Sequence, residues 1–224
     1  MARYLDPKND VIFKRIFGEH PDLLIILLKG LVPVADGGII KDIEYISIET
    51  PFGLISNIVV CCTDHRKNQF TVDIEMYANV AHNKRMRFST LSHSPTLPAY
   101  SLVIFNNYLN PGDGRINFYH TYRFTCNEDR NVTLEGLVYV IIEMPKFNPE
   151  SEELDKLSKM ATLWLRFLNE VNENTVSVDK DLLNNKFICK AVELCEIDRF
   201  TPEQIDAYNK YRDDTNRDKV KKYK

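Results

Sequence analysis

Two features that mark common protein classes are missing from this sequence of 224 residues: a surplus of basic residues and a long apolar run. Lysine and arginine number 29 against 32 aspartates and glutamates, which leaves a net charge of −3. Such a chain has no overall attraction for nucleic acid or anionic membrane, so any DNA contact needs a local basic patch. The longest apolar run, residues 23–28, is far shorter than the roughly 20 residues that cross a bilayer. We expect no membrane partner.

Motifs of secretion, structural zinc and the common hydrolases are also missing. The N-terminus is polar and then amphipathic, unlike a secretory signal peptide. The five cysteines are odd in number and lack C-x-x-C spacing, which argues against a disulfide framework and a zinc ribbon. There is no G-x-S-x-G, H-E-x-x-H, P-loop or dinucleotide-binding glycine pattern. We therefore expect a cytoplasmic protein with reduced thiols.

What the sequence does contain is periodicity, helical at both ends and strand-like in the middle. Asn9 is a predicted helix cap, Gly18 ends that helix, and Pro21 opens the next one. This order predicts an α/β layer architecture with helices over a central sheet. The expected elements are helices over 9–18 and 21–31, strands over 39–49, 58–63 and 69–77, a helix over 79–92, strands over 100–108, 115–125 and 134–144 with a turn at 111–114, helices over 154–171, 181–195 and from 201, and a charged tail from 212 that should fray.

The strand over 69–77 carries the best candidates for chemistry. Asp73, Glu75 and Tyr77 leave one face of this strand, because side chains alternate with a period of two. Carboxylates two residues apart stand roughly 6.5–7 Å apart along a strand, so both can reach one divalent cation. The alternative is an ordinary solvent-facing strand with two acidic side chains.

Several stretches of the chain are similar to the landmarks of one protein family: Arg3–Gly18, Phe70–Met76, Phe118–Tyr122, Glu143–Phe147, Trp164–Leu168, Ala191–Cys195 and Phe200–Glu203. They resemble the recombination-promoting nuclease and transposase family of the PD-(D/E)XK nuclease superfamily. The resemblance covers nearly the whole chain. It implies a restriction-endonuclease-like α/β fold, a central mixed sheet flanked by helices with a helical C-terminal part, and magnesium-dependent cleavage of double-stranded DNA.

This resemblance also divides the chain. Residues 1–148 are expected to form the nuclease-like domain, and residues 149–211 a C-terminal helical segment packed on it. Residues 212–224 are expected to form a charged, frayed tail.

The site implied by the resemblance is incomplete in this chain. In the superfamily, an Asp on the first hairpin strand and an acid on the second hold the metal, and a Lys or Gln two residues later orients the attacking water. Glu75 matches the second acid, and Asp73 is a candidate to replace the missing ligand. Tyr77 stands at the Lys or Gln position. Asp73 and Glu75 are thus the candidate metal ligands and catalytic residues of a degenerate motif.

The first hairpin strand offers no replacement Asp. With the hairpin centred at residues 66–67, Val60 is predicted to face Asp73 and Ile58 to face Glu75. Asn57 is the nearest polar residue, and it does not lie opposite Glu75 in this register. We therefore expect cleavage activity that is weak or lost.

Residues outside the hairpin complete the candidate set. Asp10 and Lys14 share a helix face at i,i+4 spacing, which is compatible with an ion pair on a solvated face. The alternative, implied by the resemblance, is that Asp10 assists the metal and Lys14 contacts DNA. Lys84, Arg85 and Arg87 form the local basic patch. This patch either contacts DNA phosphates or is a solvated face of a helix.

Three functions follow as hypotheses. The first is a metal-dependent DNA endonuclease linked to transposition or recombination. The second is a non-catalytic DNA-binding protein that keeps the nuclease fold. The third is a self-associating pseudoenzyme, for example a homodimer formed through a sheet edge or the C-terminal helices.

Overall fold

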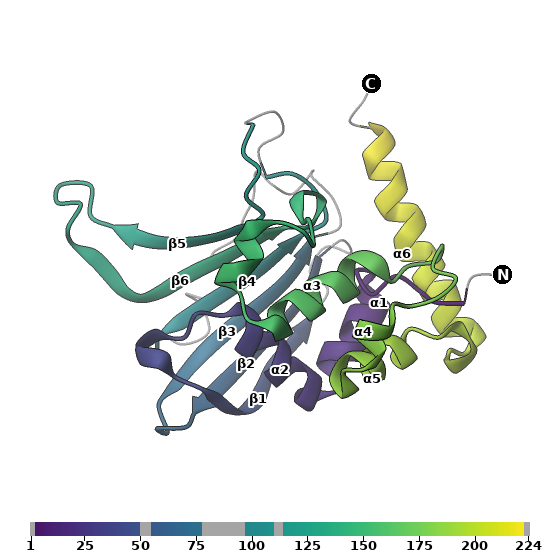
Figure 1. The fold of residues 1–224 in the computed structure, drawn as a ribbon, viewed down its shortest axis with the longest axis horizontal. Coiled ribbons are helices and arrows are strands. Elements are labelled where there is room, and N and C mark those ends of the chain that lie inside the picture. Colours follow the sequence, from purple (N-terminus) through teal and green to yellow (C-terminus); the bar gives the residue numbers. More distant parts are fainter. Residues whose placement is uncertain (1–2, 50–54, 78–96, 110–113, 222–224) are drawn as a thin grey trace.

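A computed structural model describes residues 3–49, 55–77, 97–109 and 114–221 (Figure 1). Its centre is a six-stranded mixed sheet in the order β1-β2-β3-β4-β6-β5. Neighbours β3, β4 and β6 run parallel, whereas β1 with β2, β2 with β3, and β5 with β6 pair antiparallel. The strands are β1 (Ile40–Glu49), β2 (Ile55–Asp64), β3 (Gln69–Tyr77), β4 (Ala99–Phe105), β5 (Tyr119–Thr125) and β6 (Thr133–Glu143).

The helices precede and follow the sheet in the chain. Asn9 caps the first one by accepting a hydrogen bond from the backbone N–H of Val11, as its type and position predict. A π-helical turn, Lys14–Gly18, continues it to the expected end. The α-helices are α1 (Asp10–Phe13), α2 (Pro21–Leu31), α3 (Lys159–Glu170), α4 (Lys180–Leu183), α5 (Lys186–Leu194) and α6 (Pro202–Lys221), and the 3₁₀ turns are Ala35–Gly37, Met144–Lys146, Glu152–Lys156 and Ile197–Arg199.

The main core lies between the helices and one face of the sheet. Alternate strand residues such as Ile74 and Leu102 point to this face and pack with Leu27 and Trp164 of the helices. Trp164 is fully buried. Burial of this many large apolar side chains is the main stabilising contribution to the fold.

The opposite face of the sheet has a smaller apolar core and several buried polar groups. Tyr77 stacks on Phe105, with ring centroids 4.9 Å apart, and Val103 and Ile141 pack beside them. The polar residues on this face include the candidate acids of β3. This polar face is where the site is built.

The expected order of helices and strands is confirmed over the described residues, except that the single helix expected over 181–195 is two helices, α4 and α5, separated at residues 184–185. The helix expected over 79–92 and most of the turn at 111–114 lie outside them. In the structure α6 continues through Arg212 to Lys221, where the sequence predicts fraying, and the fraying stays a prediction. Among the described residues, no helix is both long and apolar enough to cross a membrane.

Candidate active site

Strand β3 presents the candidate acids on the polar face of the sheet. Its alternation of Val72, Ile74 and Met76 with polar residues sends the apolar side chains into the main core. Asp73 is fully buried and Glu75 is 5% exposed, so the strand is not a solvent-facing one. Ordinary surface acids stay in water, because burial of a carboxylate is costly unless it is hydrogen-bonded or paired.

The pairing of β2 with β3 differs from the predicted register by one residue. Asn57, not Ile58, lies opposite Glu75, and Val59, not Val60, lies opposite Asp73. The sequence-based placement of Asn57 away from Glu75 was therefore wrong. Because side chains alternate, this one-residue shift moves Asn57 onto the polar face beside the acids.

The turn between the two strands explains the shift. The last cross-strand pair is Thr63 with Gln69, which leaves a five-residue turn centred on Arg66. The Asp64 carboxylate accepts hydrogen bonds from the backbone N–H groups of Arg66 and Asn68, and Lys67 takes a positive φ of 69°. These contacts fix an odd-numbered turn, whereas the prediction assumed a turn centred between two residues.

Asn57 is directly bonded to one of the candidate acids. Its amide nitrogen donates to Asp73 Oδ1 over 2.5 Å, along the diagonal between neighbouring strands. Asn57 itself is 7% exposed. At the cross-strand position of Glu75, where an acid would add a third carboxylate, the chain therefore has a neutral amide that donates to Asp73.

Tyr77 binds the other acid. Its hydroxyl donates to Glu75 Oε2 over 2.6 Å. Burial, followed by the nearby Glu75 carboxylate, raises the pKa of the Tyr77 hydroxyl well above its ordinary value. At neutral pH this phenol is therefore a hydrogen-bond donor to Glu75 and not a base.

Asp73 and Glu75 together offer a divalent cation only two carboxylate ligands. Mg²⁺ is usually held by one or two carboxylates, with water and substrate phosphates filling its other positions. Among the residues that the structure describes, no group of three or more His, Cys, Asp or Glu side chains is placed to hold a metal. Any cation bound here would depend on water and substrate for most of its ligands.

The other candidate residues fall into two groups. Asp10 and Lys14 form the i,i+4 ion pair, with Lys14 Nζ 3.1 Å from Asp10 Oδ1. Asp10 also lies beside α6, where burial and then the Asp10 carboxylate raise the pKa of the Tyr211 hydroxyl. The basic patch at 84–87, which comprises Lys84, Arg85 and Arg87, lies outside the described residues.

Another buried carboxylate on this face, Glu143, was not singled out from the sequence as a site residue. It ends β6 on the polar face, in register with Phe105 of β4 and hence with Tyr77 of β3. Its Oε1 accepts a hydrogen bond from Lys146 Nζ at 2.9 Å and lies 3.0 Å from His120 Nε2. The one sequence signal was that 118–122 and 143–147 are both among the stretches that resemble the nuclease family.

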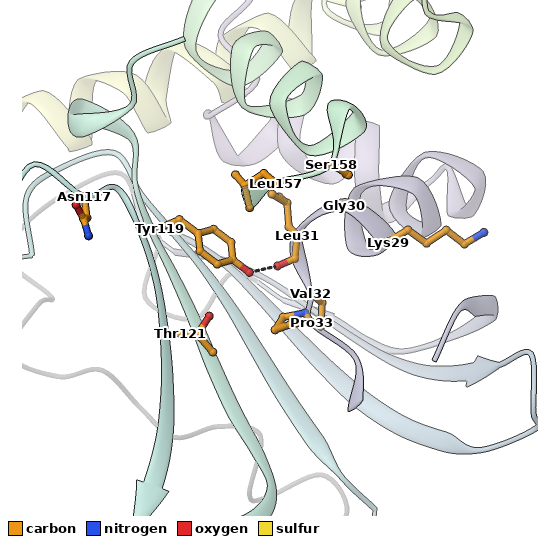
Figure 2. Close-up of a pocket in the computed structure, with 10 residues that line it drawn as sticks. All are labelled: Lys29, Gly30, Leu31, Val32, Pro33, Asn117, Tyr119, Thr121, Leu157 and Ser158. Carbon is orange, nitrogen blue, oxygen red and sulfur yellow. Dashed lines mark hydrogen bonds between the residues drawn. The ribbon is translucent and has the colours of Figure 1, made fainter. Parts of the chain in front are cut away.

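A cavity of ≈ 490 Å³ lies away from these acids, between the end of α2 and strand β5 (Figure 2). The Tyr119 hydroxyl donates to the carbonyl oxygen of Leu31 across it, over 2.9 Å. None of the candidate residues lines this cavity. It is therefore separate from the site on the polar face.

The six-stranded mixed sheet, its flanking helices and the helical C-terminal part define a restriction-endonuclease-like α/β fold. Residues 7–223 match the family described as PD-(D/E)XK nuclease family transposase, and the chain belongs to this family. Searches of curated proteins and of solved structures each return no match. Membership supports a nuclease or transposition-related function with DNA as the substrate, and PD-(D/E)XK nucleases generally depend on a divalent metal.

Proposed function

We propose that this protein acts on double-stranded DNA through the β2–β3 face and that its cleavage activity is weak or lost. Glu75 and Asp73 are the residues that would hold a magnesium ion, and Asp10 would assist them. Lys84, Arg85, Arg87 and Lys14 would contact DNA phosphates. A bound divalent ion would supply Lewis-acid stabilisation of the phosphate charge during hydrolysis.

The observation that carries this proposal is the pairing of Asn57 with Glu75 and Asp73. The β2 position opposite Glu75 is suited to the carboxylate expected on the first hairpin strand, and here it has an amide whose nitrogen donates to Asp73. An amide brings no negative charge to a cation, so the site attracts Mg²⁺ less strongly than a site with three carboxylates.

Tyr77 supports the same proposal. Its hydroxyl is committed as a donor to Glu75, and its raised pKa keeps it protonated at neutral pH. It therefore does not accept a proton from an attacking water, and it occupies Glu75 Oε2 with a hydrogen bond. Both properties lower the activity expected of the site.

Two measurements on the purified protein test the proposal. The first measurement follows duplex binding by fluorescence anisotropy at increasing salt, with and without chelator. We expect the affinity to fall as salt rises and to be unchanged by chelator. Combined substitution of Lys84, Arg85 and Arg87 by Ala should also lower the affinity. Plasmid nicking is assayed with Mg²⁺ or Mn²⁺, and any nicking should vanish in Glu75→Ala. Absence of duplex binding at low salt would contradict the proposal, as would rapid nicking by the wild-type protein. Nicking that survives Glu75→Ala would contradict the assignment of Glu75 to the site.

A further inference from the structure

The carboxyl ends of the parallel strands β4 and β6 border a cavity that the proposed function does not use. Its volume is ≈ 920 Å³, which is within the size range of small-ligand sites. It is lined by three chain segments, Tyr108 after β4, Arg115–Asn117 before β5, and Pro145, Lys146 and Asn148 after β6, together with Ser151, Glu152 and Asp155. In open α/β sheets, ligands bind in the crevice outside the carboxyl ends of the strands.

Glu143 forms hydrogen bonds with residues in or next to all three segments. Its Oε2 accepts a hydrogen bond from the backbone N–H of Leu109 at 2.6 Å, beside Tyr108. Its Oε1 accepts from Lys146 and lies within hydrogen-bond distance of His120, and its own N–H donates to the carbonyl oxygen of Phe118. Glu143 is 2% exposed, and an ion pair this deeply buried is costly to desolvate. The Glu143–Lys146 ion pair fixes the positions of the segments that line the cavity, despite this desolvation cost.

The side chains that line the cavity match the parts of a nucleotide. Arg115 and Lys146 are cations from two different segments of the lining. Arg115 is exposed, whereas the Lys146 side chain is 8% exposed and paired with Glu143, so Arg115 is the more accessible contact for a phosphate. Tyr108 is 42% exposed and offers a ring face for a base. Glu152 and Asp155 also line the cavity, where their carboxylates disfavour a second phosphate and can accept hydrogen bonds from base amino groups.

We propose that this cavity binds one nucleotide of a single-stranded DNA segment, with its phosphate at Arg115 and its base on Tyr108. The inference rests on the proposed function, since it assigns to the same DNA-binding protein a separate subsite for an unpaired nucleotide. Register supports a common substrate, because Tyr77, Phe105 and Glu143 form one row across β3, β4 and β6. The row connects Tyr77, which donates to Glu75, with Glu143, which accepts a hydrogen bond from the cavity-lining Lys146.

The test is binding of a labelled single-stranded oligonucleotide by fluorescence anisotropy, together with titration of a deoxynucleoside monophosphate followed by NMR. We expect Arg115→Ala and Tyr108→Ala each to weaken single-strand binding at least about tenfold, because one stacked base contributes substantially to affinity. Duplex affinity should change little. Tyr108→Phe keeps the ring and should retain wild-type affinity. The matched controls are Arg130→Ala and Tyr122→Ala, which remove an exposed cation and an exposed ring from the β5–β6 hairpin.

The outcomes separate this inference from the proposed function. Unchanged single-strand affinity in Arg115→Ala and Tyr108→Ala overturns the inference, as does an equal loss in Arg130→Ala and Tyr122→Ala. Wild-type binding of duplex without binding of single strand or nucleotide also overturns it and leaves the proposed function standing. Binding of single strand and nucleotide without duplex binding supports the inference and contradicts the proposed function.

Discussion

The polar face of the sheet carries two carboxylate clusters that differ in how they are held. Glu143 accepts a hydrogen bond from the cation Lys146, and its second oxygen accepts one from the backbone of Leu109. Asp73 and Glu75 leave the same strand two residues apart, and the amide of Asn57 and the phenol of Tyr77 donate hydrogen bonds to them. All three carboxylates are buried, and Glu143 has a counter-charge in Lys146, whereas Asn57 and Tyr77 are neutral donors.

On this difference we interpret Glu143 as a structural carboxylate and Asp73 and Glu75 as the carboxylates of the proposed functional site. Removal of either member of the Glu143–Lys146 pair leaves the other charge buried. By contrast, two like charges placed side by side raise the free energy of the folded state, an arrangement that is common where charges serve a ligand. The following changes test the comparison, beginning with the largest expected effect.

Glu143→Ala should lower the free energy of unfolding by about 3–5 kcal/mol, because Lys146 then remains buried without its partner. Urea unfolding at neutral pH measures the change. The combined substitution of Glu143→Leu and Lys146→Met removes both charges and should be far closer to wild type. A loss below about 1 kcal/mol in Glu143→Ala would show that the pair does not hold these segments together.

Tyr77→Phe should lower the free energy of unfolding by about 1.5–3 kcal/mol at neutral pH, since it keeps the stack on Phe105 but removes the hydrogen bond to Glu75. The raised pKa of Tyr77 adds a pH dependence. Its contribution to stability is present in full below the ordinary tyrosine pKa of about 10 and is lost as the pH rises above that value. Unfolding measured across the alkaline range should therefore show a shallower decline in Tyr77→Phe, and an identical slope would argue against the buried position of the phenol.

Glu75→Gln should change the free energy of unfolding by less than about 1 kcal/mol, because it keeps an acceptor for Tyr77 and removes one of two neighbouring negative charges. Glu143→Gln is the matched variant on the same face and should be clearly more destabilising. Equal losses in the two variants, measured by the same urea unfolding, would remove the distinction between the clusters.

The strands were predictable because their alternation is strong. The periodicity of Phe70, Val72, Ile74 and Met76 identified both the extent of β3 and the face that carries the acids. The register of β2 was not predictable, since it depends on an odd-numbered turn held by Asp64 contacts that a pattern of apolar residues does not encode.

The Glu143 cluster could not be found from local sequence for a different reason. Its partners lie at residues 109, 120 and 146, in three segments that meet only because β4, β5 and β6 are neighbours in the sheet. Only part of the candidate site was predictable, again because some of its contacts form between strands. Asp73, Glu75 and Tyr77 follow from one strand, whereas the place of Asn57 beside them depends on pairing between strands.

The most direct measurement of the central claim is plasmid nicking by the double variant Asn57→Asp and Tyr77→Gln with Mg²⁺ or Mn²⁺. The change adds a carboxylate opposite Glu75 and removes the phenol that binds it. We predict a nicking rate at least about tenfold above wild type, which corresponds to about 1.4 kcal/mol of the activation free energy. Addition of Glu75→Ala should abolish that gain. A double variant that folds and binds duplex DNA but nicks no faster than wild type would contradict the claim that Asn57 and Tyr77 weaken this site.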